Sequence, residues 1–97
     1  MNINQIKQVL TIAEEKNLTN AAKKLFISQP SLSKSIKLLE EELGFELFER
    51  NPIKLTHAGE SFVSKAKRIM ADIGELEIEM SDLSSRSKTY IFIGIPS

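Results

Sequence analysis

Apolar residues recur along the first part of the chain with the spacing of amphipathic helices. Residues 3–15 carry such a pattern, with polar side chains between its apolar positions, which are Ile3, Ile6, Val9, Leu10 and Ala13. A shorter pattern follows in "NAAKKLF", which begins at Asn20. Because threonine hydroxyls often accept a hydrogen bond from the first turn of a helix, we predict that Thr19 is the N-cap of this segment. The sequence thus predicts two helices, separated by a break at Asn17 and Leu18.

The stretch "ISQPSLSKSI", residues 27–36, has the composition of a loop, although apolar helical patterns flank it on both sides. Ser28 suits an N-cap, and Pro30 suits the first turn of a helix, where its missing N–H has little effect. Beyond the proline, apolar residues recur at spacings of four, three and four, at Leu32, Ile36, Leu39 and Leu43. Gly44 suits the residue that ends a helix. We therefore predict a turn followed by a helix from Gln29 to Leu43, with its polar side chains facing away from the core.

Residues 45–56, "FELFERNPIKLT", alternate apolar and polar side chains, as short strands do. Three apolar residues are expected to be buried, namely Phe45, Leu47 and Phe48. Ile53 and Leu55 are expected to form a strand after the "NP" turn. Two short strands that follow a helix-turn-helix would form a wing, with Arg50 and Lys54 as its cationic groups.

One long helix is predicted from residue 57 to residue 87, with Thr56 as a suitable N-cap. Its apolar residues alternate between spacings of four and three, and they form a heptad seam of Phe62, Ala66, Ile69, Ile73, Leu76, Met80 and Leu83. At ~1.5 Å per residue the helix would be about 45 Å long, longer than a domain of this size can cover. A second copy of the helix is the simplest partner for the seam. Alternatively, the stripe packs on the chain's own first helix or on a further domain.

The end of the chain is expected to belong to another domain. The polar segment "SSRSKT", residues 84–89, is predicted to be a hinge, and "YIFIGIPS" after it is predicted to be a buried strand. Because a lone strand has no sheet of its own, we expect the sequence to be a piece of a longer protein.

Composition narrows the range of functions. The 97 residues include no cysteine and one histidine, His57, so disulfides and Cys- or His-based metal sites are implausible. There is no apolar run of about 18 residues and no signal-peptide layout, which indicates a cytoplasmic protein. The net charge is zero, yet residues 19–39 carry four lysines and no acidic residue, and residues 40–42 are all glutamate. These glutamates are expected to form a solvated face, beside a cationic region centred on the predicted turn.

The tip of the helix that begins at Gln29 carries side chains that suit the major groove of DNA. Glutamine can pair with adenine, serine can bond to donors and acceptors, and lysine can reach guanine or phosphate. A helix N-terminus also favours a nearby phosphate.

Three other interpretations remain open at this point. The four lysines could be an ordinary solvated surface, and the helical seam could belong to a coiled-coil interaction module that does not bind DNA. Ser31 and Lys34 also match the Ser-x-x-Lys pattern of some serine acyl-enzymes, but the sequence has no Ser-Asp-Asn or Lys-Thr-Gly partner for it.

Three blocks of the chain resemble the LysR-type transcriptional regulators. They are "LTNAAKKLFISQPSLSKSIKLLEEELG", similar to the family's helix-turn-helix block, "LFERN" with "LTHAG", similar to its wing and linker start, and "YIFIGIPS", similar to the first strand of its effector domain. The resemblance implies a mainly α fold, a winged helix-turn-helix of three helices and a short two-stranded wing, followed by a long dimerising linker helix. The implied domains are residues 1–57 (helix-turn-helix about 18–37), the linker 58–87, and the hinge and first strand of a truncated effector-binding domain at 88–97.

The resemblance also implies partners and site residues. We expect a non-enzymatic DNA-binding regulator that contacts double-stranded DNA through Thr19, Gln29, Pro30, Ser31, Ser33, Lys34, Lys37, Arg50 and Lys54. It would form a homodimer through the seam, or a tetramer in a full-length protein. No cofactor is expected in this chain, and a small-molecule effector would bind the missing C-terminal domain. Pro52 and Ile53 stand where relatives often have a basic residue, so Lys54 is the remaining candidate for a minor-groove contact.

Overall fold

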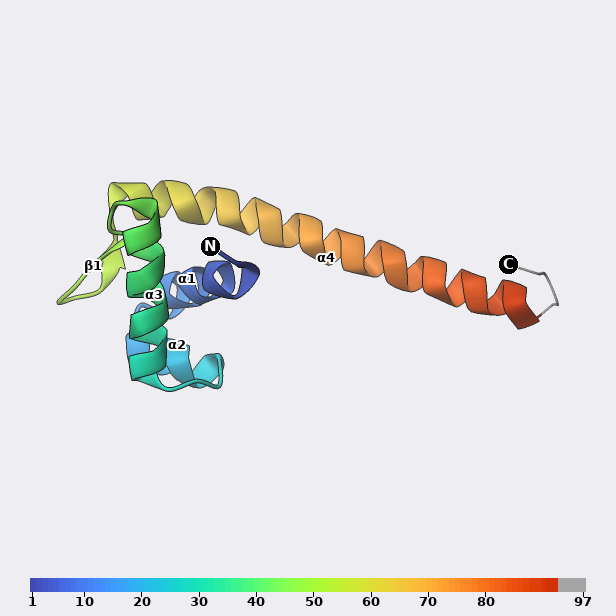
Figure 1. The fold of residues 1–97 in the computed structure, drawn as a ribbon, viewed down its shortest axis with the longest axis horizontal. Coiled ribbons are helices and arrows are strands. Elements are labelled where there is room, and N and C mark those ends of the chain that lie inside the picture. Colours follow the sequence, from blue (N-terminus) through green and yellow to red (C-terminus); the bar gives the residue numbers. More distant parts are fainter. Residues whose placement is uncertain (93–97) are drawn as a thin grey trace. The chain divides into compact units, whose positions relative to one another are not determined.

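The computed structural model describes residues 1–92, with side chains as far as Ser85, and divides the chain into two units, Met1–Lys67 and Arg68–Ser97. The elements follow in the order α1 (Ile3–Glu15), α2 (Leu18–Lys24), α3 (Gln29–Leu43), β1 (Phe48–Glu49), β2 (Lys54–Leu55) and α4 (His57–Phe92) (Figure 1). The predicted fold class, a three-helix domain with a two-stranded wing and a long final helix, is confirmed.

Asparagine side chains begin the first two helices. The Asn2 side chain accepts a hydrogen bond from the Gln5 N–H at 2.8 Å, and the Gln5 side chain accepts one from the Asn2 N–H at 3.1 Å, which completes a capping box. Asn17 begins α2 by accepting a hydrogen bond from the Asn20 N–H at 2.8 Å. The prediction that Thr19 is the N-cap is therefore wrong, because Asn17 already satisfies the first turn and Thr19 lies exposed inside the helix.

The core of the first unit lies where α1, α2, α3, the wing and the start of α4 meet. Three residues of α3, Leu32, Ile36 and Leu39, are completely buried, as predicted. They pack in one cluster with Val9, Ile12, Ala21, Ala22, Leu47, Phe48 and Val63. The prediction for Phe45 is wrong: its side chain is 49% exposed, and the chain turns inward only at Leu47.

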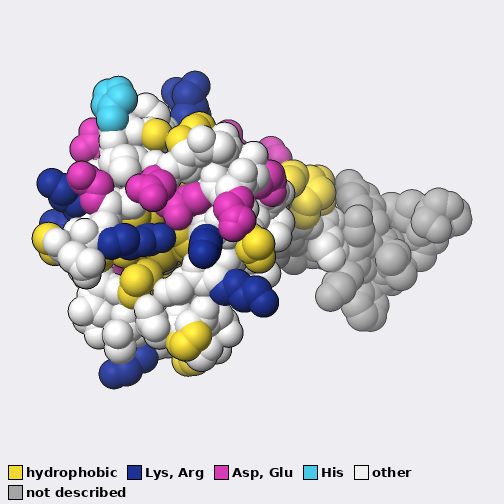
Figure 2. Space-filling view, turned by 60° about the vertical axis from the view of Figure 1, so that its left-hand side comes forward, with side chains coloured by type: hydrophobic (Ala, Val, Ile, Leu, Met, Phe, Trp, Pro, Cys, Tyr) yellow, Lys and Arg dark blue, Asp and Glu magenta, His cyan; other side chains and the backbone are white. Residues whose placement is uncertain are grey.

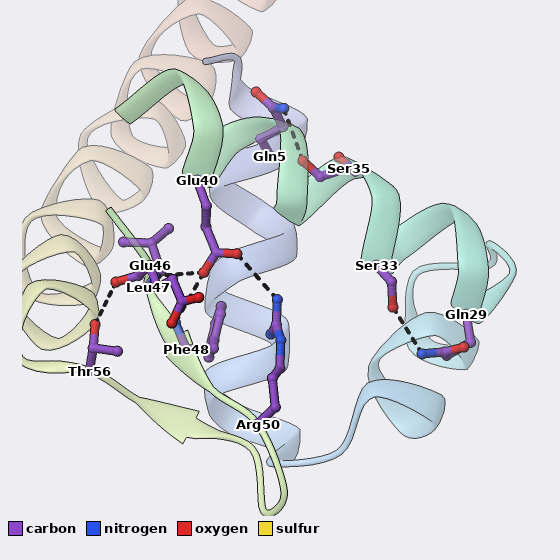
Figure 3. A network of polar contacts seen from close by, with 10 residues as sticks. All are labelled: Gln5, Gln29, Ser33, Ser35, Glu40, Glu46, Leu47, Phe48, Arg50 and Thr56. Atoms are coloured by element: carbon purple, nitrogen blue, oxygen red, sulfur yellow. Dashed lines mark hydrogen bonds and ion pairs between the residues drawn. The ribbon is translucent and has the colours of Figure 1, made fainter. Parts of the chain in front are cut away.

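Glu40 connects α3 to the wing from a nearly buried position. One oxygen of its carboxylate accepts hydrogen bonds from the backbone N–H groups of Leu47 (2.6 Å) and Phe48 (3.2 Å). The other accepts a hydrogen bond from Arg50 Nη2 at 3.2 Å (Figure 3). The predicted solvated face is thus wrong at Glu40, which lies four residues after Ile36 and shares the buried side of α3.

The wing is held in turn against the start of α4. Its two strands are antiparallel, with Phe48 opposite Leu55. Thr56 caps α4 as predicted, because its hydroxyl accepts a hydrogen bond from the Gly59 N–H at 3.0 Å and donates one to the Glu46 carbonyl at 2.7 Å. A Cβ at Gly59 would lie 2.0 Å from the Leu47 carbonyl oxygen, so this close approach requires glycine.

The helix α4 extends beyond its predicted end. Residues 84–89, predicted to be a hinge, are helical, and so are residues 90–92 of the predicted strand. Residues 93–97 of that strand lie outside the described residues. The hinge prediction relied on polarity alone, whereas residues 84–89 contain neither glycine nor proline to interrupt a helix. None of the helices in the described part of the chain is long and apolar enough to cross a membrane.

We predict that Glu40→Ala lowers the free energy of unfolding by about 2–4 kcal/mol, because it leaves two backbone N–H groups and Arg50 without their acceptor. Urea unfolding followed by circular dichroism measures this loss. The matched control is Glu41→Ala, at an exposed neighbour, for which a change under about 0.5 kcal/mol is expected. Equal losses in the two variants would contradict the assigned role of Glu40.

Candidate nucleic-acid interface

The N-terminal tip of α3 is shaped by a serine cap and a proline. The Ser28 hydroxyl oxygen accepts a hydrogen bond from the Ser31 N–H at 3.2 Å and donates its own hydrogen to the Ser31 hydroxyl at 2.8 Å. Pro30 lies exposed in the first turn, as predicted. The partner of the Ser31 hydroxyl is therefore Ser28 and not Lys34, which leaves the acyl-enzyme interpretation without its required contact.

Gln29 and Ser33 form a pair along the surface of α3. The Gln29 amide nitrogen donates a hydrogen bond to the Ser33 hydroxyl at 2.9 Å, and both side chains are half-buried (Figure 3). The sequence had suggested that the Gln29 side chain projects freely into solvent. In the structure it is instead held against Ser33. The pair keeps the Gln29 oxygen as an acceptor and the Ser33 hydroxyl hydrogen as a donor for an external partner.

The lysines divide into paired and unpaired groups. Lys23, Lys34 and Lys37 are exposed and form no ion pair within the described residues. Lys24 instead contacts Glu14 and Glu15, and the hydrogen bond to Glu14 raises the pKa of Lys24 above its usual value. Figure 2 shows acidic side chains among the Lys and Arg side chains on the face it presents, so the positive charge there does not form one continuous patch.

Both cations of the wing have acidic partners. Arg50 donates to Glu40, as described above, and the Lys54 ammonium lies 3.4 Å from the Glu49 carboxylate. The Lys54–Glu49 pair is largely exposed and therefore weak, so Lys54 can leave Glu49 and bind a phosphate of DNA instead. Arg50 pairs with the nearly buried Glu40, so its position suits fixing the wing to α3 better than contacting DNA.

Thr19 and Arg50, far apart in the sequence, line one shallow groove between the start of α2 and the turn of the wing. Its other lining residues are Lys16, Asn17, Leu18, Asn51, Pro52 and Ile53. Among the predicted site residues, Thr19 and Arg50 therefore line this groove, the six from Gln29 to Lys37 lie on α3, and Lys54 lies on β2 outside the groove. Lys16, an exposed cation that also lines the groove, was not predicted, because nothing in the local sequence distinguishes it from an ordinary solvated lysine.

The turn between α2 and α3 contains a strained residue. Phe26 has φ 58 and a side chain that is 94% exposed. Two hydrogen bonds close the turn, from the Phe26 N–H to the Lys23 carbonyl and from the Ile27 N–H to the Ala22 carbonyl. This is the position after a helix that glycine usually occupies.

The predicted dimerisation residues fall into two groups, one packed within the first unit and one exposed on the second. Ala66 is 2% exposed and Phe62 packs partly against the core of the first unit, so the prediction that Ala66 contacts a second copy is wrong. Its own domain already covers that side chain. In the second unit, four seam residues are about half exposed, namely Ile69, Leu76, Met80 and Leu83, while Ile73 is partly covered.

Comparisons with known proteins agree with this architecture. The family model described as bacterial regulatory helix-turn-helix protein, lysR family, matches residues 3–60. The HTH-type transcriptional regulator BsdA of Bacillus subtilis (strain 168) is 40% identical over 97 residues, which cover 97% of this chain and 33% of BsdA. The chain thus spans about one third of that relative's length.

Solved structures resemble the chain closely as well. The crystal structure of the BenM_DBD/catB site 1 DNA complex matches with a TM-score of 0.85 and 34% identity, covering 88% of this chain and 97% of that one. The CbnR_DBD–DNA complex matches with a TM-score of 0.80 and 35% identity, covering 87% of this chain and 99% of that one.

We predict that Phe26→Gly raises the free energy of unfolding by about 1 kcal/mol, because glycine adopts the left-handed backbone conformation without strain. Thermal unfolding would show the gain as a higher Tm. Phe45→Gly is the matched control, since Phe45 is also exposed but has no positive φ, and this variant should lose stability. A fall in Tm for both variants would contradict the strain at Phe26.

Proposed function

The chain belongs to the LysR family of bacterial regulatory helix-turn-helix proteins, and we propose that it is the DNA-binding part of a sequence-specific transcriptional regulator. The observation that carries the proposal is the tip of α3, where polar and cationic side chains face outward from a buried apolar anchor. The likeness to BenM_DBD and CbnR_DBD, both solved with DNA, supports DNA as the partner of this chain.

In the proposed complex, α3 enters the major groove with its N-terminus first. The Gln29–Ser33 pair offers an acceptor and a donor to base edges, and Lys34 reaches a guanine or a phosphate. Lys34 is a point charge without the bidentate fork of arginine, so its base preference is weaker than that of an arginine in its place. Lys23 and Lys37, both unpaired in the described residues, contact phosphates and set affinity.

The remaining expected contacts come from Pro30, Ser31, Thr19 and the wing. Pro30 and Ser31 are small and exposed, so they let the α3 backbone approach the groove. Thr19, which lines the shallow groove of the protein together with Arg50, contacts the DNA backbone. Arg50 acts by positioning the wing through Glu40, whereas Lys54 reaches the minor groove only after it leaves Glu49.

The regulator acts as a homodimer in this proposal. The exposed apolar stripe of α4, formed by Ile69, Ile73, Leu76, Met80 and Leu83, is the dimer surface. A symmetric dimer presents two α3 helices to two half-sites of an inverted repeat, about 34 Å or a multiple of it apart. In this proposal the protein works in the cytoplasm, without catalysis. In a longer form of the chain, a C-terminal domain binds a small-molecule effector and takes part in tetramer formation.

A rival proposal from another class is a coiled-coil interaction module that does not bind DNA, which the stripe of α4 alone would allow. Retention on random duplex DNA separates the two. The regulator is retained at low salt and released at high salt, because phosphate contacts release counterions, whereas the interaction module is not retained.

We predict that Gln29→Ala costs about 1–3 kcal/mol in DNA binding and relaxes the preference at one base pair, because one base-edge acceptor is lost. Titration against operator variants with single-base changes measures both effects. Asn4→Ala, an exposed substitution on α1, is the control and should change neither. An unchanged base preference in Gln29→Ala would refute the assigned contact.

We also predict that Ile73→Glu breaks the dimer, because it places a charge in the middle of the apolar stripe. Sedimentation velocity should then show a monomer. The matched control is Ile78→Glu, whose side chain is 65% exposed and lies outside the stripe, and this variant should remain dimeric. A dimer in both variants would rule out the stripe as the interface.

A further inference from the structure

Lys16 ends α1 in a backbone conformation that lysine seldom adopts. Its φ is 55° and its ψ is 28°, in the left-handed region, and its N–H donates a hydrogen bond to the Ile12 carbonyl at 2.8 Å. A residue with a Cβ is strained in this region, which is why many helices end there in glycine. Strain that a folded chain retains is a reason to look for a function of the strained residue.

The charge of Lys16 has no acidic partner. The side chain is exposed and forms no ion pair within the part of the chain that the structure describes. Lys16 borders two hollows of the first unit. One of them includes Glu60 and Lys54, and the other is the shallow groove between the start of α2 and the turn of the wing. Because Lys16 is not paired with Glu60, its ammonium is available to a ligand in the shallow groove.

The shallow groove offers hydrogen-bond donors and no carboxylate. None of its eight lining residues is acidic, and Arg50, its other cation, is already paired with Glu40. The Asn17 amide oxygen accepts the Asn20 N–H, which leaves the amide nitrogen of Asn17 as a donor. A ligand that carries negative charge and only accepts hydrogen bonds therefore fits this groove.

Other hollows of the first unit have a different charge. The hollow beside Phe45 includes Glu40, Glu41 and Glu46 with one lysine, and the hollow between α1 and α4 includes Glu14 with one lysine. In both, carboxylates balance or outnumber the cations, so the attraction for an anion is weak. The shallow groove is better suited to an anion than either of them.

The location of the shallow groove identifies the anion. Thr19 lines it, and Thr19 is among the residues that we propose to contact the DNA backbone. Asn51, on the turn of the wing, adds an amide on the other wall. A phosphodiester carries one negative charge and has acceptor oxygens only, which matches the lysine, amide and hydroxyl donors of the groove.

We propose that the shallow groove is a phosphate seat, in which Lys16 binds one phosphate of the DNA backbone with Asn17, Thr19 and Asn51 as further donors. The proposal rests on the DNA binding of the proposed function and deepens it, because it assigns a contact outside α3 to a residue that the sequence pattern does not indicate. Glycine would relieve the strain at position 16 but would lose the ammonium. Stability and DNA binding are therefore opposed at this position.

Lys16→Gly separates the two effects. The variant should unfold about 4 °C above the wild-type chain, because glycine adopts the left-handed conformation without strain. Its affinity for duplex DNA should fall about fivefold at low salt and evenly across sequences, and the slope of log affinity against log salt should flatten by about 0.9. Thermal unfolding and titrations at several salt concentrations measure these changes. Lys7→Ala, which removes an equal charge from an exposed position of α1, is the matched control and should leave DNA binding unchanged.

Two further substitutions separate charge from backbone freedom. Lys16→Asn is neutral and tolerates the left-handed conformation, so it should lose affinity as Lys16→Gly does, without the added freedom of glycine. Lys16→Arg keeps the charge and should bind DNA as the wild-type chain does. A loss of affinity in Lys16→Gly alone would assign the effect to backbone freedom and overturn the phosphate seat.

Neutral phosphate analogues locate the contact on DNA. In a duplex selected for binding, single phosphates are replaced one at a time by uncharged methylphosphonates. At the contacted phosphate, the replacement should weaken binding of the wild-type chain but not of Lys16→Asn, which has already lost the contact. If every replacement affects the two proteins equally, the phosphate seat is wrong.

The outcomes separate this inference from the proposed function. A wild-type chain that binds DNA with the same affinity and salt slope as Lys16→Asn would refute the phosphate seat and leave the role of α3 in place. A wild-type chain that is not retained on duplex DNA would overturn both.

Discussion

The carboxylate of Glu40 is the interaction on which the arrangement of the first unit depends most. It lies at the edge of the buried side of α3 and accepts hydrogen bonds from Leu47, Phe48 and Arg50. A nearly buried carboxylate is costly unless its oxygens are satisfied, and here three donors from the start of the wing satisfy them. The orientation of α3 is therefore fixed against the wing, and through Leu47 and Thr56 against the start of α4 as well. A helix held in this way can present its tip to DNA, as we propose for α3, with little loss of freedom on binding.

The unpaired cations, and not the total number of cations, define the proposed DNA surface. Arg50, Lys54 and Lys24 all have acidic partners, so the wing and the end of α2 carry less free positive charge than the sequence suggests. Lys34 and Lys37 remain on α3, next to the Gln29–Ser33 pair. A chain with zero net charge can thus present a localised cationic tip, while several of its acidic residues pair with its other cations.

The sequence predicted the parts of the fold that depend on local periodicity and capping. The bounds of α1 and α3, the buried residues of α3 and the Thr56 cap followed from spacing and side-chain chemistry. It did not predict interactions that depend on tertiary contacts. Glu40 was predicted to face solvent because it is charged, although its position four residues after Ile36 places it on the buried side of α3. Ala66 was assigned to the dimer because a heptad pattern does not show that the chain's own core covers it. The Gln29–Ser33 contact needed side-chain conformations, which no spacing rule provides.

Selection of bound duplexes from a random pool tests the central claim most directly, namely that the fixed α3 tip reads DNA in a symmetric pair. The account predicts enrichment of an inverted repeat whose half-sites lie on one face of the duplex, about one helical turn or a multiple of it apart. Recovery of duplexes without a shared sequence, or with a single unpaired site, would contradict it.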